Sequence, residues 1–155
     1  MNPTPAIVAE FLAGKRLAVA GVSRNPQQAA NAVFRKLRGA GYEVVPLNPN
    51  VAELEGTPCY PDVAAVPFAL DGVVIATHPR DALQVVRQCA EHGVRSVWFH
   101  RSFGQGSVAE EAVRECQARG LTCIAGGCPL MYVEPVDPFH RCFRWFLGLR
   151  GRVPR

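Results

Sequence analysis

The sequence contains no apolar run that approaches the roughly 18 residues of a membrane-spanning helix. Its N-terminus also lacks a charged segment followed by a hydrophobic one, which is the pattern of an export signal. We therefore expect a soluble protein of the cytoplasm with no membrane partner. In that compartment the six cysteines should stay reduced, since they are scattered through apolar segments and form no loop-rich disulfide framework.

Over most of the chain neither positive nor negative charge is in excess. Of the 17 basic residues, five lie in the last fifteen positions, where there is no acidic residue. The rest of the chain carries 12 basic against 13 acidic residues, a net charge of −1. A nearly neutral body does not offer the positive face that duplex DNA needs, so we expect no nucleic-acid partner.

The sequence also lacks His and Cys residues at the spacing of a metal site. His140 and Cys142 stand two positions apart on an expected helix, where their side chains diverge. No second ligand pair follows them with the spacing of a zinc site. We therefore expect no metal site.

From residue 16 onward, short apolar runs alternate with helical patterns, which is typical of βαβ units in a parallel sheet. Because parallel crossovers are almost always right-handed, the possible topologies reduce to a doubly wound sheet. The sequence predicts one α/β domain over 1–155, with a parallel five-stranded sheet inside a three-layer αβα fold. The expected strands are Arg16–Gly21, Tyr42–Asn48, Gly72–Ala76, Ser96–His100 and Leu121–Ala125.

Helix signals lie between the expected strands. Asn25 should cap a helix over Gln27–Arg38, with Pro26 in its first turn. A capping box, Ser107-x-x-Glu110, should open a helix over Ser107–Arg119. Further helices are expected over Ala6–Leu12 and Asp81–His92, whereas the segment from 49 to 71 reads mostly as loop.

A C-terminal helix over 136–149 should begin at Asp137, with Pro138 next to this cap. It presents an apolar stripe that should pack against the sheet, made of Phe139, Cys142, Phe143, Phe146 and Leu147. Three cysteines on helical apolar stripes, Cys89, Cys116 and Cys142, should behave as small core residues.

Ligands of open α/β sheets bind beyond the carboxyl ends of the strands, which here are followed by loops at 21–25, 48–50, 77–79, 100–104 and 126–129. In the first loop Gly21 allows a sharp turn and Ser23 offers a hydroxyl. The helix that follows directs free N–H groups and its positive dipole end at the same place, where a phosphate fits. Only one glycine of the G-x-G-x-x-G fingerprint is present, so a plain capped strand-to-helix turn fits the same residues.

The end of the second strand bears on which ligand this is. A site for NAD would place an acidic residue there to bind the ribose hydroxyls. This chain has Asn48 at that position. The sequence therefore disfavours NAD.

Several segments occur together in an order that resembles the coenzyme A-binding domain family, which is similar to the N-terminal domain of the succinyl-CoA synthetase α subunit. They are Ala18-Val19-Ala20-Gly21-Val22-Ser23, Val44-Val45-Pro46-Leu47-Asn48-Pro49-Asn50, Gly56–Val66, Asp71-Gly72-Val73-Val74-Ile75 and the later Cys128-Pro129. The resemblance covers about residues 15–130. It implies a Rossmann-like domain that binds coenzyme A across the strand ends.

The resemblance also implies where the ligand lies, with the pyrophosphate near Ser23, the adenosine near Asn48–Asn50 and Arg24 contributing charge. Family members often have a lysine where this chain has Asn50, and no Lys or Arg occurs from 39 to 79. Arg24 or Arg101 could take over the ribose 3′-phosphate, because arginine grips phosphate through two parallel hydrogen bonds. The candidate cofactor-binding residues, none with a catalytic role, are Gly21, Val22, Ser23, Arg24, Asn25, Asn48, Pro49, Asn50, Thr77, His78, Pro79, Arg101 and Cys128.

Three functions stay open on these residues. The first is a non-catalytic protein that binds coenzyme A or acyl-CoA, because no convincing catalytic group accompanies the phosphate-ready turn. The second is an enzyme that uses Cys128 or His100 on a CoA ester. The third is a regulatory domain for NAD or an adenine nucleotide, with a possible homodimer through the hydrophobic C-terminal helix.

Overall fold

The computed structural model describes residues 4–101 and 104–154. Two residues of the expected fourth loop, Ser102 and Phe103, lie outside the described residues. The main sheet has five parallel strands in the order β2-β1-β5-β6-β7. The strands are β1 (Arg16–Ala20), β2 (Glu43–Leu47), β5 (Gly72–Ile75), β6 (Ser96–Phe99) and β7 (Thr122–Ala125). The predicted fold class is confirmed, and each strand lies within one or two residues of its expected bounds.

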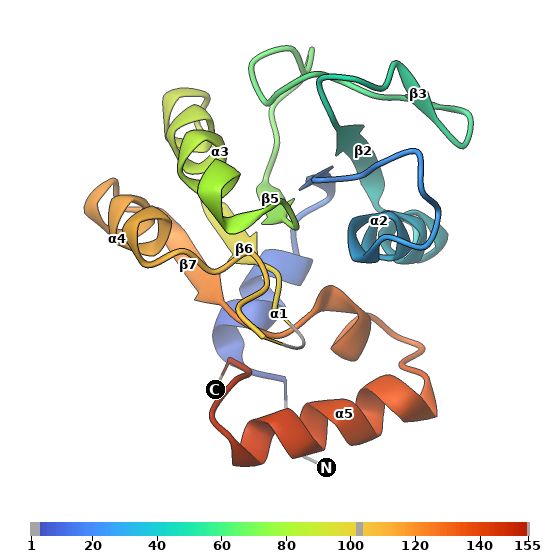
Figure 1. The fold of residues 1–155 in the computed structure, drawn as a ribbon, viewed down its shortest axis with the longest axis vertical. Coiled ribbons are helices and arrows are strands. Elements are labelled where there is room, and N and C mark those ends of the chain that lie inside the picture. Colours follow the sequence, from blue (N-terminus) through green and yellow to red (C-terminus); the bar gives the residue numbers. More distant parts are fainter. Residues whose placement is uncertain (1–3, 102–103, 155) are drawn as a thin grey trace.

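Helices cover both faces of the sheet (Figure 1). One face packs against α1 (Ala6–Leu12), α2 (Ala29–Gly39) and the 3-10 turn η1 (Pro129–Met131). The other packs against α3 (Pro79–Glu91) and α4 (Glu110–Ala118). All four residues of β5 and of β6 are buried, as expected for central strands that have no solvent-facing side.

The segment after β2 contains a small hairpin that the sequence analysis missed. Strands β3 (Glu53–Leu54) and β4 (Thr57–Pro58) pair in antiparallel fashion. Two-residue strands carry too little alternation to be recognised from a pattern. The turn between them is seen in the backbone, where Glu55 and Gly56 both have positive φ.

Two predicted helix starts were wrong. The first residue of α2 is Ala29, and Asn25 instead closes a turn before the helix, where its Oδ1 accepts a hydrogen bond from Gln27 N at 3.0 Å. The first residue of α4 is Glu110, and the hydroxyl of Ser107 donates to Thr77 O and forms no capping box. In both cases the side chain that was expected to cap a helix bonds to a loop.

The C-terminal helix α5 (Pro138–Leu149) begins where predicted, with Asp137 Oδ1 accepting a hydrogen bond from His140 N at 3.0 Å. Its expected packing on the sheet is confirmed only in part, because buried Leu147 belongs to the core on one face of the sheet while the main neighbour of α5 is η1. It packs against η1, and Figure 1 shows it outside the sheet layers. Leu147 is buried, but Phe139 and Cys142 are exposed, so Cys142 is not a core residue. Cys89 and Cys116 are buried as expected. No described helix is long and apolar enough to span a membrane.

Candidate functional site

The loop after β1 turns at Gly21 against the end of the neighbouring strand β5. Gly21 has φ +101°, and a Cβ atom there would lie 2.4 Å from the carbonyl oxygen of Ala76. Any larger residue would combine backbone strain with a clash against main chain. Glycine is therefore required for the close approach of two loops that a ligand would contact together.

Asn31 holds the next part of this loop. Ser23 N donates to Asn31 Oδ1 at 2.9 Å, and Asn31 Nδ2 donates to Ser23 O at 2.7 Å. Asn31 is only 1% exposed, and both ends of its buried amide are satisfied by Ser23. Sequence reasoning missed this residue. The sequence feature that could have indicated Asn31 is a polar amide next to Ala30 on the buried face of α2.

The amino end of α2 carries donors with no acceptor. Among the described residues nothing accepts a hydrogen bond from the backbone N–H of Arg24, Ala29 or Ala30, and Gln28 provides no side-chain cap. Three neighbouring N–H groups are satisfied within the loop: Asn25 N donates to Ser23 Oγ at 3.0 Å, and the N–H groups of Gln27 and Gln28 donate to oxygens of Asn25. Open N–H groups at a helix start, with the positive end of the helix dipole, form a place for an anion.

Two side-chain hydrogen bonds join the loop after β2 to this one, and a third holds the loop after β2 itself. Asn48 Nδ2 donates to Val22 O at 2.5 Å, and Asn48 Oδ1 accepts from Asn50 N at 2.7 Å. Arg24 Nη2 donates to Asn50 O at 2.8 Å. The guanidinium of Arg24 thus lies beside Asn50. It brings a positive charge to a stretch of chain that has none of its own.

The loop after β5 completes this end of the sheet. His78 Nδ1 accepts a hydrogen bond from Arg80 N at 3.3 Å and so caps α3, whose first residue is Pro79. Thr77 Oγ1 donates to His78 O, and Thr77 O accepts from Ser107 Oγ at 2.6 Å. The expected site residues of the first three loops therefore lie together, around the ends of adjacent strands β2, β1 and β5.

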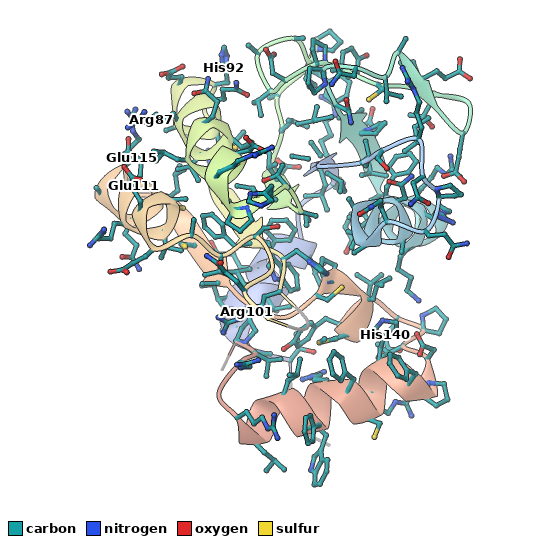
Figure 2. The ribbon with its side chains drawn as sticks, in the orientation of Figure 1. Arg87, His92, Arg101, Glu111, Glu115 and His140 are labelled. Carbon is teal, nitrogen blue, oxygen red and sulfur yellow. The ribbon has the colours of Figure 1, made fainter. Side chains whose placement is uncertain are left out.

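Arg101 and Cys128 lie at the other end of the row of loops. Arg101 N donates to Gly127 O at 2.9 Å, and Arg101 Nε is buried without a hydrogen-bond partner among the described residues. The C-terminal segment covers this region, because a Cβ on Gly126 would lie 2.8 Å from Arg152 O. Figure 2 shows Arg101 far from β2, toward β7 and the C-terminal segment. Arg101 thus lies toward β7, whereas Cys128 belongs to the buried core on the α2 side of the sheet, together with Val22 of the first loop.

The two groups considered for chemistry are both buried. Burial raises the pKa of the Cys128 thiol to about 12, and the residue is 2% exposed. Burial also lowers the pKa of His100 to about 4. At neutral pH one is a thiol and the other a neutral imidazole. Within the described ranges no three His, Cys, Asp or Glu side chains come close enough to hold a metal ion.

Comparison with known proteins gives a family match. A family model described as a CoA binding domain matches residues 15–134. The chain is 29% identical over 128 residues to the uncharacterized protein YneT of Bacillus subtilis, which covers 82% of this chain and 92% of that protein.

Two further relatives come from Pyrococcus. The α subunit of the ADP-forming acetate–CoA ligase II of Pyrococcus furiosus is 30% identical over 106 residues, 68% of this chain but 23% of the subunit. A solved structure of a hypothetical protein from Pyrococcus horikoshii is 28% identical, with a TM-score of 0.73 over 83% of this chain and 92% of that one. The chain thus spans less than a quarter of the ligase subunit it matches.

Proposed function

The chain belongs to the CoA binding domain family, and on that premise we propose that it binds coenzyme A or an acyl-CoA through the loops after β1, β2 and β5. We take 1–155 as one domain for this function. The ligand crosses the carboxyl ends of the strands, where open α/β sheets bind nucleotides.

The observation that carries this proposal is the set of unpaired N–H groups at the start of α2. Arg24, Ala29 and Ala30 supply three donors, and the dipole of an eleven-residue helix adds a partial positive charge. A diphosphate satisfies such donors, as phosphates do at other helix starts. We place the pyrophosphate there, with the loop geometry maintained by the two bonds between Ser23 and Asn31.

Arg24 is the residue that we assign to the ribose 3′-phosphate. Its guanidinium already reaches Asn50 at the end of β2, where the adenosine is expected. Arg101 is a poor substitute, because β6 is three strands away from β2 and strands lie about 4.8 Å apart, which makes roughly 14 Å. Of these two arginines, Arg24 is therefore the one that brings a charge to the adenosine end of the ligand.

The same geometry favours binding over catalysis. A nucleophilic cysteine needs a thiolate, and the raised pKa of Cys128 keeps that group protonated at neutral pH. His100 is neutral but enclosed, with 8% of its surface exposed. A domain that holds coenzyme A and presents it to another protein requires neither group.

Calorimetric titration with coenzyme A, dephospho-coenzyme A, NAD and ATP tests the proposal. We expect coenzyme A to bind most tightly. The variant Arg24→Gln should weaken coenzyme A binding about 10- to 100-fold, since a hydrogen bond to a charged group contributes about 1.5–3 kcal/mol, and should weaken dephospho-coenzyme A much less.

Arg114→Gln is the matched control, because Arg114 lies on α4 and, among the residues that the structure describes, pairs with Glu110 alone, at 3.2 Å. Its affinity for coenzyme A should equal that of the parent. Failure of coenzyme A to bind at millimolar concentration would overturn the proposal. Tighter binding of NAD or ATP would replace it with the nucleotide-regulated alternative.

A further inference from the structure

The large hydrophobic side chains that are exposed among the described residues all lie on α5. They are Phe139 (65% exposed), Trp145 (63%), Phe146 (41%) and Leu149 (70%). α5 packs on the rest of the protein through another side of the helix, which includes buried Leu147. In Figure 2 side chains project from α5 into the space away from the rest of the protein. A helix that is apolar on both sides needs a second partner.

We propose that α5 forms a homodimer interface in which the helices of two copies pack antiparallel. Phe139, Cys142, Phe146 and Leu149 follow one another at spacings of three, four and three residues, which is the seam of a helix pair. Cys142 is exposed and free, so the whole seam is accessible.

The seam is symmetric about residue 144, and this fixes the register of the pair. In an antiparallel arrangement Phe139 faces Leu149 of the partner subunit, and Cys142 faces Phe146 of the partner subunit. A small side chain thus meets a large one in the middle, as interdigitated packing requires. The same register repeats on both sides of the two-fold axis, so one surface patch serves both copies.

The charges at the two ends of α5 agree with that register. Asp137 stands at the start of the helix, and no acidic residue occurs after it, whereas Arg150 and Arg152 follow the helix end. Symmetry about residue 144 places Asp137 opposite position 151 of the partner, between two arginines. Hydrogen bonds from His140 lower the pKa of Asp137, so its carboxylate is charged over the usual pH range.

Helix dipoles also favour the antiparallel arrangement, because each positive end lies beside a negative one. A second copy therefore supplies both an apolar seam for these side chains and, through Arg150 and Arg152, positive charge beside Asp137. The four exposed side chains present roughly 450 Å² of apolar area, taking about 150–250 Å² for each whole side chain. That is more than half of the approximately 800 Å² that each partner contributes to a stable interface.

Additional apolar surface lies beside the seam. A cavity of about 820 Å³ opens between α5 and η1, and its lining includes Met131, Tyr132, Val136 and Trp145. Side chains of a second copy would close this cavity from outside. The inference does not depend on the ligand proposed above, because α5 lies apart from the loops after β1, β2 and β5.

Light scattering of the full chain between about 1 and 100 μM tests the oligomeric state. We expect a mass of two chains for the parent. Phe139→Gln and Leu149→Gln should each raise the dimer dissociation constant at least tenfold, with unchanged circular dichroism and unchanged coenzyme A affinity. A monomeric parent at 100 μM, or a dimer that both variants leave intact, would overturn the inference.

A cross-linking experiment tests the register. Phe146→Cys, oxidised with copper–phenanthroline, should give a disulfide-linked dimer through Cys142 of the partner subunit. The double variant Cys142→Ser/Phe146→Cys is the control and should not cross-link. Cross-linking of that control, or of the parent through Cys142 alone, would show a different register and contradict the arrangement.

Discussion

The clamp between Asn31 and Ser23 offers the sharpest test of how the candidate site is built. Asn31→Ala removes two hydrogen bonds of 2.9 and 2.7 Å and leaves the N–H and C=O of Ser23 without partners. Each lost bond costs about 1 kcal/mol and each unsatisfied group about 1–3 kcal/mol if it stays dry. Partial access of water to the loop reduces that sum, and we expect a loss of about 2–4 kcal/mol in the free energy of unfolding.

The variant Asn31→Asp separates the lost bond from the lost volume. Its carboxylate would still accept from Ser23 N, but its second oxygen would face the carbonyl oxygen of Ser23. Burial and that carbonyl raise the pKa of the new carboxyl above the value of about 3.9 that it has in the unfolded chain. The protonated acid donates to Ser23 O, so the penalty is small below about pH 4 and grows as the pH rises.

Urea unfolding at pH 4 and pH 8 measures both effects. Ser96→Ala is the control, because the buried Ser96 hydroxyl has no hydrogen-bond partner among the described residues, and its removal should cost less than about 0.5 kcal/mol. Coenzyme A affinity should fall together with stability in Asn31→Ala, since the loop that carries Arg24 is no longer held. An Asn31→Ala variant as stable as the parent, or an Asn31→Asp penalty that is equal at both pH values, would refute this account.

Three further outcomes are expected. Gly21→Ala should destabilise the fold by at least about 2 kcal/mol more than Gly41→Ala in thermal unfolding, because both have positive φ but only Gly21 meets main chain within 3 Å; equal losses would contradict the close approach. Iodoacetamide should spare Cys128 in the folded protein and modify it after unfolding in urea, as mass spectrometry would show; rapid labelling of Cys128 in the folded protein would contradict its burial. The pKa of His100 is lowered to about 4, so the unfolded state binds a proton first and stability should fall as the pH drops from about 6.5 to 4, by about 2–4 kcal/mol. A His100→Gln variant should lose that part of the pH dependence.

The regular parts of the fold follow closely from the sequence. Apolar runs such as Gly72–Ile75 are long enough to mark a buried strand, and the glycine-ended helical patterns between them mark the crossovers. The capping assignments for Asn25 and Ser107 failed for a common reason. Both are short polar side chains that bond to whichever backbone group lies nearest, and the tertiary structure decides which group that is.

The candidate site divides in the same way. The sequence indicates the Gly21–Asn25 turn and its phosphate-ready helix, because strand, glycine and helix are consecutive in the chain. It offers Arg24 and Arg101 equally as partners of a phosphate. The strand order separates them, since it places β1 next to β2 and β6 three strands away from β2.

Taken alone, the sequence determined the order and type of the main-sheet strands and their helices, the parallel sheet and the loop with the character of a phosphate site, since each of these depends on neighbours in the chain. Only the tertiary structure decided which loops meet, that Asn31 clamps Ser23, that Arg24 lies at Asn50 and that α5 leaves an apolar face uncovered. These features join residues from separate elements. Their positions follow from strand order and packing, which local periodicity does not specify.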